Sequence, residues 1–497
     1  MSRPIERVGA SRPCERSGWS SAEILGPLDP AFAKPKAVAL LERAENRHLL
    51  DHVALDAFGA HVFPGDLPGY PPARFLEELN RQIVDGNPIH VWVNLPVCEQ
   101  RCHFCQFPVV TSSHADRRGG VLQRWVDANV KEVQLWLEAV PALGQVPIGA
   151  FNILGGTPTL LSDEQLGALL CFYREHFHFR EETSIRIEGT ASTFSGARLE
   201  KLKSLGVRNV SSGIQSFDDT VLAAAHCIHT AADAVHYLER ARPRFAVDLD
   251  LMYGMAGQDV RGFLEDVRYA LVHGVTCLVL TKLHLRTFAE TRSAVSGQRP
   301  AAWQSPRARR KLEEQGLRWP SLGEQYQMRE AAVDLLCGSR YREHPTMYFH
   351  HPEREPPEWK ALTVDQDKQF AEVGFGMGGS SSCMRAEAIN AATEAGYFGL
   401  LDQGRIPLGS ARGFTDRGLV TKSIRMALTS CQPLQDGLFR ERHPGQSLFE
   451  PPWLRVFERL ERRGLARIDG PGRRIALTDV GRTLVEAIIH TEFEQEG

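Results

Sequence analysis

Between residues 89 and 290, short apolar runs alternate with stretches that have the periodicity of amphipathic helices. Regular alternation of strands and helices predicts a parallel sheet covered by helices, and the functional site of such folds lies at the carboxyl ends of the strands. Helical patterns are expected at 123–140, 163–176 and 195–205. Six runs are expected to be strands, namely 89–95, 150–154, 184–188, 209–214, 247–252 and 277–283. We therefore expect an α/β fold whose sheet is open or rolled into a partial barrel.

The flanking segments carry weaker signals. A helix is predicted near 37–57, a Pro/Gly-rich linker at 63–72, and a short helix directly after it. The stretch from 291 to 370 is irregular apart from a helix expected at 324–336. Near the C-terminus the pattern predicts a helix (452–463), two strands (466–469 and 474–477) and a helix capped by Thr478, which is the order of a small winged-helix-like module.

Composition narrows the class of protein. The net charge is −3 over 497 residues, and acidic residues dilute the arginines of the C-terminal module, so a nucleic-acid partner is not expected. No stretch approaches the roughly 18 apolar residues of a membrane span, and no secretory signal is readable. We expect a soluble, cytoplasmic protein with no membrane partner.

Three of the ten cysteines fall within eight residues, as Cys98, Cys102 and Cys105. Thiolates at this tight spacing suit a [4Fe–4S] cluster in which one iron lacks a protein ligand. A structural zinc site normally needs four ligands, commonly from paired CxxC units, and the sequence has no second pair. The spacing therefore favours an iron–sulfur cluster whose open iron chelates S-adenosylmethionine (SAM), while zinc is the alternative.

Two further motifs follow predicted strands. Gly155-Gly156-Thr157-Pro158 comes one strand after the cysteines, where a glycine turn would let the backbone approach the methionyl end of SAM. Glu188 ends the strand at 184–188, where it could bind a ribose or remain an exposed charge. Both motifs are weak on their own and gain meaning from their position in the strand order.

Taken in order, IHVWVNLPVCEQRCHFC, LGGTPTLLS, RIEGT, LGVRNVSSGIQSFDD, DLDLMYGMAGQ and VGFGMGGSSS resemble the HemN-type radical SAM family. That family includes oxygen-independent coproporphyrinogen III oxidase, a haem chaperone, and the class C methyltransferases and cyclopropanases. The resemblance implies an incomplete (β/α)6 TIM-like barrel with an N-terminal extension and a winged-helix-like HemN domain. The implied division is 1–88 (extension), 89–290 (barrel core), 291–400 (barrel completion and substrate pocket) and 401–497 (C-terminal domain).

The resemblance also implies two SAM molecules and an electron donor such as flavodoxin or ferredoxin. Gly155 and Glu188 match contacts of the cluster-bound SAM. Trp92 stands where the oxidase has a SAM-contacting tyrosine, and Cys227 stands where the family has an arginine that would pair with a carboxylate. The residues that match contacts of the second SAM are Phe104, Gly156, Thr157, Gln215 and Asp250.

Within the family, two branches lack their motifs here. Cys105 is followed by Gln106 without the second cysteine of the oxidase, and the haem motif of the chaperone is absent. His344, His350 and His351 are expected to be surface histidines, although they could bind a ligand.

The class C branch is therefore favoured, with transfer of a SAM-derived one-carbon unit to an sp2 carbon. The substrate would be an unsaturated or aromatic small molecule, such as a secondary metabolite or a tetrapyrrole. The alternatives are an oxidase-like oxidoreductase, a haem-degrading methyltransferase or a haem chaperone. Tyr253 and His103 are candidate proton acceptors, and their alternative roles are core packing and shaping of the cysteine loop.

Overall fold

The computed structural model of the chain describes residues 19–54, 67, 69–83, 87–113, 116, 120–284, 301–354 and 371–493. Its main feature is a mixed sheet of twelve strands. Within the described residues, the two outermost strands pair with no further strand, so the sheet is open. Its order is β14 (Leu408–Gly413), β13 (Ala386–Asn390), β12 (Ser380–Ser382), β11 (Ala371–Phe375), β1 (Ile89–Leu95), β4 (Pro147–Gly155), β5 (His178–Gly189), β6 (Asn209–Gln215), β7 (Ala246–Tyr253), β8 (Cys277–Lys282), β10 (Tyr348–His350) and β9 (Arg342–Glu343).

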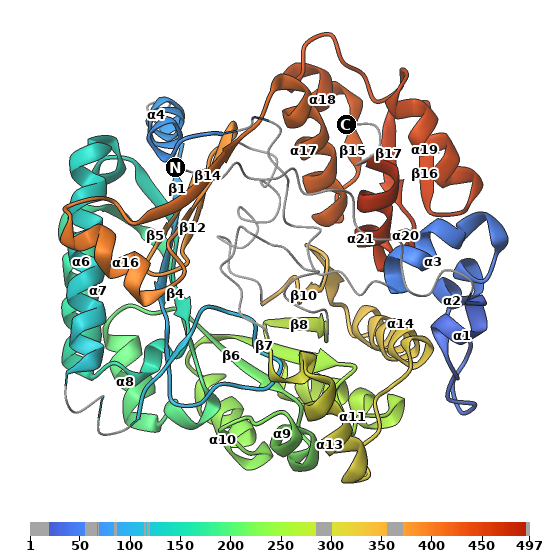
Figure 1. Cartoon of the computed structure of the whole chain (residues 1–497), viewed down its shortest axis with the longest axis horizontal. Helices are drawn as coiled ribbons and strands as arrows, with labels where there is room; N and C mark the ends of the chain where they lie inside the picture. Colours follow the sequence, from blue (N-terminus) through green and yellow to red (C-terminus); the bar gives the residue numbers. More distant parts are fainter. Residues whose placement is uncertain are drawn as a thin grey trace, which may run out of the picture.

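The six strands β1, β4, β5, β6, β7 and β8 are mutually parallel and correspond to the six strands expected from the sequence. That prediction is confirmed, although β4 and β5 begin earlier than expected. Because neighbouring parallel strands need a crossover, each returns through a helix on the outside of the sheet. Figure 1 shows the sheet curving around an interior, with α6 (Val121–Ala139), α7 (Asp163–His176), α8 (Gly196–Ser204), α10 (Ala231–Ala241) and α11 (Val260–His273) outside it.

The predicted helices at 123–140, 163–176 and 195–205 are thus confirmed as α6, α7 and α8. The start of α7 follows from a capping box, because the hydroxyl of Ser162 accepts a hydrogen bond from the amide of Gln165 at 3.1 Å. The faces of these helices that point to the sheet form one large core with it, in which Trp136 and Phe151 are fully buried. Burying an apolar side chain of this size contributes roughly 1.5–3 kcal/mol.

The helical stretch predicted near 37–57 is present in its described part, but it is interrupted and forms two helices. The first helix, α2 (Lys36–Leu41), is separated by a 3-10 turn from the second, α3 (Arg47–Ala54). The buried side chain of Asn46 donates a hydrogen bond to the carbonyl of Leu40 at 2.9 Å, which captures an acceptor that a continuing helix would use. The end of this prediction and most of the predicted linker at 63–72 lie outside the described residues.

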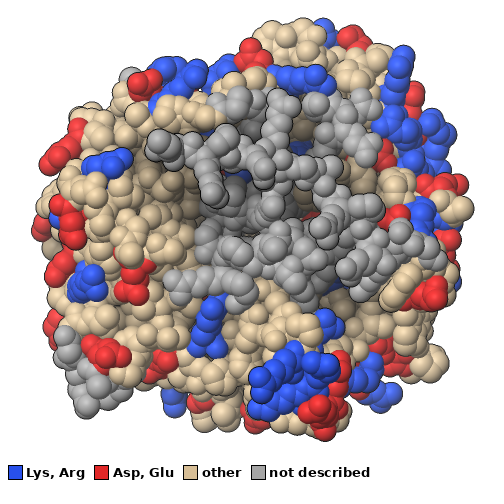
Figure 2. Space-filling view, in the orientation of Figure 1, with Lys and Arg blue, Asp and Glu red and all other residues tan. Residues whose placement is uncertain are grey.

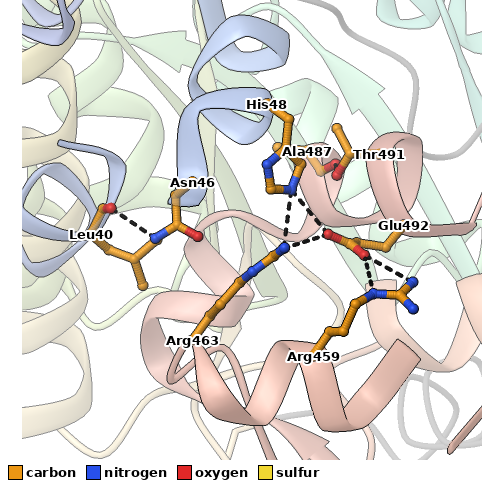
Figure 3. A network of polar contacts seen from close by, with 8 residues as sticks. All are labelled: Leu40, Asn46, His48, Arg459, Arg463, Ala487, Thr491 and Glu492. Atoms are coloured by element: carbon orange, nitrogen blue, oxygen red, sulfur yellow. Dashed lines mark hydrogen bonds and ion pairs between the residues drawn. The ribbon is translucent and has the colours of Figure 1, made fainter. Parts of the chain in front are cut away.

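A second hydrophobic core joins the two ends of the chain. Buried leucines of α2 and α3 pack with apolar residues between 420 and 493. Beside this core, Glu492 accepts hydrogen bonds from Arg463 (2.6 Å) and Arg459 (3.3 Å) and lies 3.0 Å from His48 Nε2 (Figure 3). Burial would raise the pKa of Glu492, but these partners lower it overall. The N-terminal helices are therefore held on the C-terminal module by both apolar and charged contacts.

The C-terminal module has the predicted order of helix, β-ribbon and helix. Its elements are α19 (Trp453–Arg462), β16 (Ala466–Asp469), β17 (Arg474–Leu477) and α20 (Asp479–Thr483). Thr478 caps α20 as expected, because its hydroxyl accepts the amide of Gly481 at 3.1 Å. α14 (Leu322–Gly338) likewise confirms the helix predicted at 324–336, and α4 (Pro72–Ile83) the short helix after the linker. None of the helices in the described ranges combines the length and apolar character that a membrane span requires.

Candidate functional site

The loop with the three cysteines begins where β1 ends, and the glycine turn after β4 docks directly on it. The amides of Gly156 and Thr157 donate to the carbonyls of Leu95 and Val97, both at 2.7 Å. Gly155 has a φ of +119°, and a Cβ there would lie 2.0 Å from a side-chain oxygen of β1. Only glycine fits this close approach, so the sequence of the turn determines its contact with the cysteine loop.

The three cysteines lie half-buried along this loop. The hydroxyl of Thr157 donates to Cys98 Sγ at 3.8 Å, which connects the loop with the turn. Burial raises the pKa of Cys98 to about 12 and also raises the pKa of Cys105. Iron binding would replace these thiol protons, since cysteine ligates metals as the thiolate. Among the described residues, no three Cys, His, Asp or Glu side chains lie close enough together to bind a single metal ion. A cubane does not need such convergence, because each thiolate binds a different iron.

The inner face of the parallel sheet is polar because charged residues alternate with apolar ones along the strands. In β5, Arg186 and Glu188 alternate with isoleucines that are buried among the helices. Asp248 and Asp250 do the same in β7. Glu188 is in register with Ser211 of β6, which is in register with Asp248. Sequence reasoning missed Arg186 and Asp248, although the alternation in SIRIE and VDLDL was a signal for them.

The carboxyl groups on this face differ in whether they have a hydrogen-bond partner. Arg186 Nε lies 3.0 Å from Asp248 Oδ2, and Asn209 donates to the same oxygen at 3.1 Å. Glu188 and Asp250 have no hydrogen-bond partner within the described residues. Burial raises the pKa of Glu188, and the positive charge of Arg186 only partly offsets this effect. Burial and the charge of Glu188 raise the pKa of Asp250 to about 7. These two carboxyl groups are therefore the ones available to a ligand.

Gln215 lies next to this face, at the end of β6. Its φ of +68° is unusual for a residue other than glycine, and the pairing register with β7 shifts between Gly213 and Gln215. The Gln215 amide folds back over Gly213, where an added Cβ would lie 2.5 Å from Nε2. Backbone strain of this kind is maintained only where the surroundings over-determine it, and it is frequent at functional sites.

Between Cys102 and Cys105, the loop packs on the turn that follows α9 (Asp219–Ala224). The His103 and His226 rings are stacked at 4.6 Å, and the amide of His103 donates to the carbonyl of Ala225 at 2.9 Å. Phe104 packs in an apolar cluster with Trp303 at 6.2 Å between ring centroids. His103 therefore shapes the cysteine loop, and burial lowers the pKa of its imidazole.

Cys227 lies in the same turn and contacts the cysteine loop. The neighbouring thiol of Cys227, together with burial, raises the pKa of Cys102. The side chain also packs against the apolar cluster that contains Phe104. The residue that replaces the family's arginine thus lies beside a cysteine of the C-x3-C-x2-C motif.

The structure decides between the two roles considered for Tyr253 in favour of core packing, and it contradicts the expectation for two histidines. Tyr253 follows Asp250 by three positions, so it points to the opposite face of β7 and packs against Phe263 at 5.5 Å, away from the polar interior. His350 and His351 were expected at the surface but are buried, with exposures of 3% and 7%. They lie in or next to β10, a strand that sequence periodicity did not indicate, and burial lowers the pKa of His350 to about 3.

The glycine-rich turn 376–379 joins the site from a distant part of the chain. A Cβ on Gly376 would lie 1.9 Å from the carbonyl of Asn94, at the end of β1. The amide of Gly376 donates to the fully buried Glu132 of α6 at 2.7 Å. Tyr397 and Asn390 donate to the same carboxylate, both at 2.6 Å. Glu132 therefore anchors this turn against β1.

The residues present fit an iron–sulfur cluster with bound SAM. Three thiols share one loop, and a turn that only glycine allows lies against it. Along the strands that lead into this region, Trp92 Nε1 and Asn152 Nδ2 are buried without a hydrogen-bond partner among the described residues, and the two residues are in register. Buried polar atoms of this kind normally have a partner, so a polar ligand is expected beside them.

Asp250→Asn is expected to stabilise the SAM-free protein. A buried carboxyl whose pKa is raised from 3.8 to about 7 binds its proton more tightly in the folded state. The folded wild-type protein therefore loses stability relative to the unfolded chain as pH rises from about 4 to about 7. The asparagine variant lacks this loss, so its advantage should grow over that interval to at most about 4 kcal/mol and then stay constant. Thermal unfolding of both proteins at pH 5 and pH 8 measures the stability difference between the variant and the wild type. An equal difference at the two pH values would contradict the prediction.

Comparison with known proteins gives the following similarities. The radical SAM superfamily profile matches residues 95–270. The heme chaperone HemW of Haemophilus influenzae is 29% identical over 187 residues, covering 37% of this chain and 48% of the relative. Anaerobilin synthase of Escherichia coli O157:H7 is 29% identical over 248 residues, covering 49% of this chain and 54% of the relative. The chain thus aligns with about half the length of these relatives.

The fold is similar to that of a solved structure. Coproporphyrinogen III oxidase (HemN) from Escherichia coli, a radical SAM enzyme, superposes with a TM-score of 0.71 at 19% identity. The superposition covers 87% of this chain and 96% of that structure. Residues 95–270 therefore match the radical SAM superfamily, and the expected α/β fold, similar to that of HemN, is confirmed.

Proposed function

Because the chain contains a HemN-like radical SAM domain, we propose that it is an enzyme that uses SAM to modify a haem-type tetrapyrrole. The relatives support the tetrapyrrole alternatives better than a small molecule of unspecified class, since several of them are heme chaperones and another is anaerobilin synthase. The observation that carries the proposal is the convergence of the cysteine loop, the glycine turn and the two available carboxyl groups at one polar interior.

In this proposal each residue has a defined task. Cys98, Cys102 and Cys105 hold a [4Fe–4S] cluster, which when bound supplies the electron for reductive cleavage of SAM. The backbone of Gly155 and Gly156 receives the methionyl end of that SAM. Other residues, deeper along the strands and in the loop, complete the cofactor site, namely Trp92, Phe104, Thr157, Glu188, Gln215 and Asp250.

We place the proton chemistry at Asp250 rather than at Tyr253 or His103. Tyr253 packs in the core on the other face of β7, and His103 is stacked on His226. The Asp250 carboxyl is buried on the inner face, and its pKa of about 7 lets it hold or release a proton near neutral pH. Tyr348 of β10 is in the same register row as Asp250 through Val279 of β8, so a phenol lies near this carboxyl group.

The reaction type follows from isotope transfer. With haem as the test tetrapyrrole and a reductant, the class C hypothesis predicts one S-adenosylhomocysteine and one 5′-deoxyadenosine for each turnover. SAM with a CD3 group should put one deuterium into the 5′-deoxyadenosine, because the hydrogen comes from the second SAM. Mass spectrometry of both products measures this.

Two other results would replace the hypothesis. Unlabelled 5′-deoxyadenosine with release of carbon dioxide and no S-adenosylhomocysteine, from coproporphyrinogen III as substrate, would identify an oxidase. Stoichiometric haem binding without haem-dependent consumption of SAM would identify a chaperone, the function of several relatives. The triple cysteine-to-alanine variant at 98, 102 and 105 serves as the control for SAM cleavage that does not depend on the cluster.

A further inference from the structure

The helix α13 (Pro306–Glu314) packs directly on the cysteine loop. Trp303, in the 3-10 turn that precedes it, donates its amide to the carbonyl of His103 at 3.0 Å, and its ring lies 6.4 Å from the His103 ring. The buried Leu312 of α13 and Trp303 share an apolar cluster with Phe104 and the end of α9. One face of α13 is thus fastened to the loop that would hold the cluster.

The opposite face of α13 is basic and exposed. Arg307, Arg310 and Lys311 all point to solvent, and none of them forms an ion pair with another described residue. Figure 2 shows the resulting blue patch at the bottom of the view, where α13 lies in Figure 1. The whole chain has a net charge of −3, so this local positive charge does not follow from the overall composition.

The charges along α13 do not all suit the helix itself. Arg307 is in the first turn, whereas Lys311, Glu313 and Glu314 are in the last turn. The helix dipole favours acidic residues at the start of a helix and basic ones at its end, so only Lys311 is placed favourably. The positive charge of Arg307 in the first turn is therefore not explained by helix stability, which favours a role in binding.

Apolar and aromatic groups continue this surface toward the cysteines. Ile228 is 40% exposed, which is unusual for a large apolar side chain, and the exposed His226 stacks on His103. The turn with these two residues is fixed to the loop, since Gln100 Nε2 donates to the carbonyl of His226 at 2.9 Å. An apolar centre with a charged rim is the usual anatomy of a protein–protein interface. We name the surface made of His226, Ile228, Arg307, Arg310 and Lys311 the basic surface.

We infer that the basic surface is the docking site of an acidic electron-transfer protein that reduces the cluster. The inference rests on the proposed function, because a cluster that cleaves SAM must receive an electron from outside. Positive charge steers an acidic donor to this surface, where the His226–His103 stack leads to the cysteine loop. Exposed arginines also lie on the C-terminal module, so the test must separate the basic surface from general positive charge.

The test compares two charge reversals of equal size in the cluster-loaded protein. R307E/R310E/K311E changes the basic surface, and R455E/R462E/R467E changes three exposed arginines of the C-terminal module. A reduced flavodoxin is the probe, and its dissociation constant is measured for wild type and both variants at low and high salt. Formation of 5′-deoxyadenosine is then measured with reduced flavodoxin and, separately, with dithionite.

We expect at least about ten-fold weaker flavodoxin binding for R307E/R310E/K311E, with a reduced salt dependence and a matching loss of flavodoxin-driven turnover. Dithionite-driven turnover should be unchanged, and the C-terminal variant should bind as wild type does. Equal weakening in both variants, unchanged binding in the first, or no flavodoxin binding by the wild type would overturn the inference. Failure of dithionite to produce 5′-deoxyadenosine in the wild type would instead reject the proposed function, and the binding data would still be readable.

Discussion

Replacing Cys98, Cys102 and Cys105 together by alanine is expected to leave anaerobically reconstituted protein without a cluster, whereas the unchanged chain should hold about four irons. The three thiols are the only protein ligands that the spacing provides, and alanine offers no substitute donor. Iron and sulfide content, together with the electron paramagnetic resonance signal after reduction, measure this loss without depending on activity.

The matched control replaces Cys171 and Cys337, which are exposed and lie on the helices α7 and α14 away from the cysteine loop. This double alanine variant should retain the full iron content. Iron retained by the triple variant would reject the ligand assignment. In that case Cys227, which contacts Cys102, would be the first residue to examine as a ligand.

Glu132→Ala should produce the largest loss of stability among the single substitutions considered. Glu132 is fully buried and accepts hydrogen bonds from Gly376, Asn390 and Tyr397 at 2.6–2.7 Å. Alanine removes the acceptor of the buried Gly376 amide and the Tyr397 hydroxyl, whereas Asn390 keeps the carbonyl of Gly376 as an acceptor at 2.8 Å, and the loss costs about 3–5 kcal/mol in total. The glycine-rich turn would lose its anchor at the same time. Thermal or denaturant unfolding of the purified protein measures the effect.

Lys131→Ala is the matched control, because Lys131 neighbours Glu132 on α6 and is exposed. It should change stability by less than about 0.5 kcal/mol, as is usual for surface positions. Glu132→Gln keeps one acceptor oxygen but turns an NH2 donor toward the other partners. Its loss of stability should therefore fall between those of Glu132→Ala and Lys131→Ala. If Glu132→Ala had the same stability as Lys131→Ala, the Glu132 carboxyl group would not be the anchor of the glycine-rich turn.

The candidate site was partly readable from the sequence because its motifs are local. The cysteines lie within one loop, and Gly155, Gly156 and Thr157 follow the next strand, so strand order alone brought the two motifs together. The polar alternation in SIRIE and VDLDL also indicated an inner face with Arg186 and Asp248, but only Glu188 and Asp250 were taken from it. The position of Tyr348 and the burial of His350 were not readable, because β10 is a strand of three residues without a periodic signal.

By itself, the sequence determined the six parallel strands, their covering helices and the close spacing of the three cysteines in one loop, because periodicity and short motifs act over a few residues. Only the tertiary structure decided which distant segments complete the site. Glu132 meets Asn390 and Tyr397 across 258 and 265 residues, and α13 reaches the cysteine loop through Trp303. The two ends of the chain likewise meet in one core. Such contacts depend on packing and burial in three dimensions, which no local pattern records.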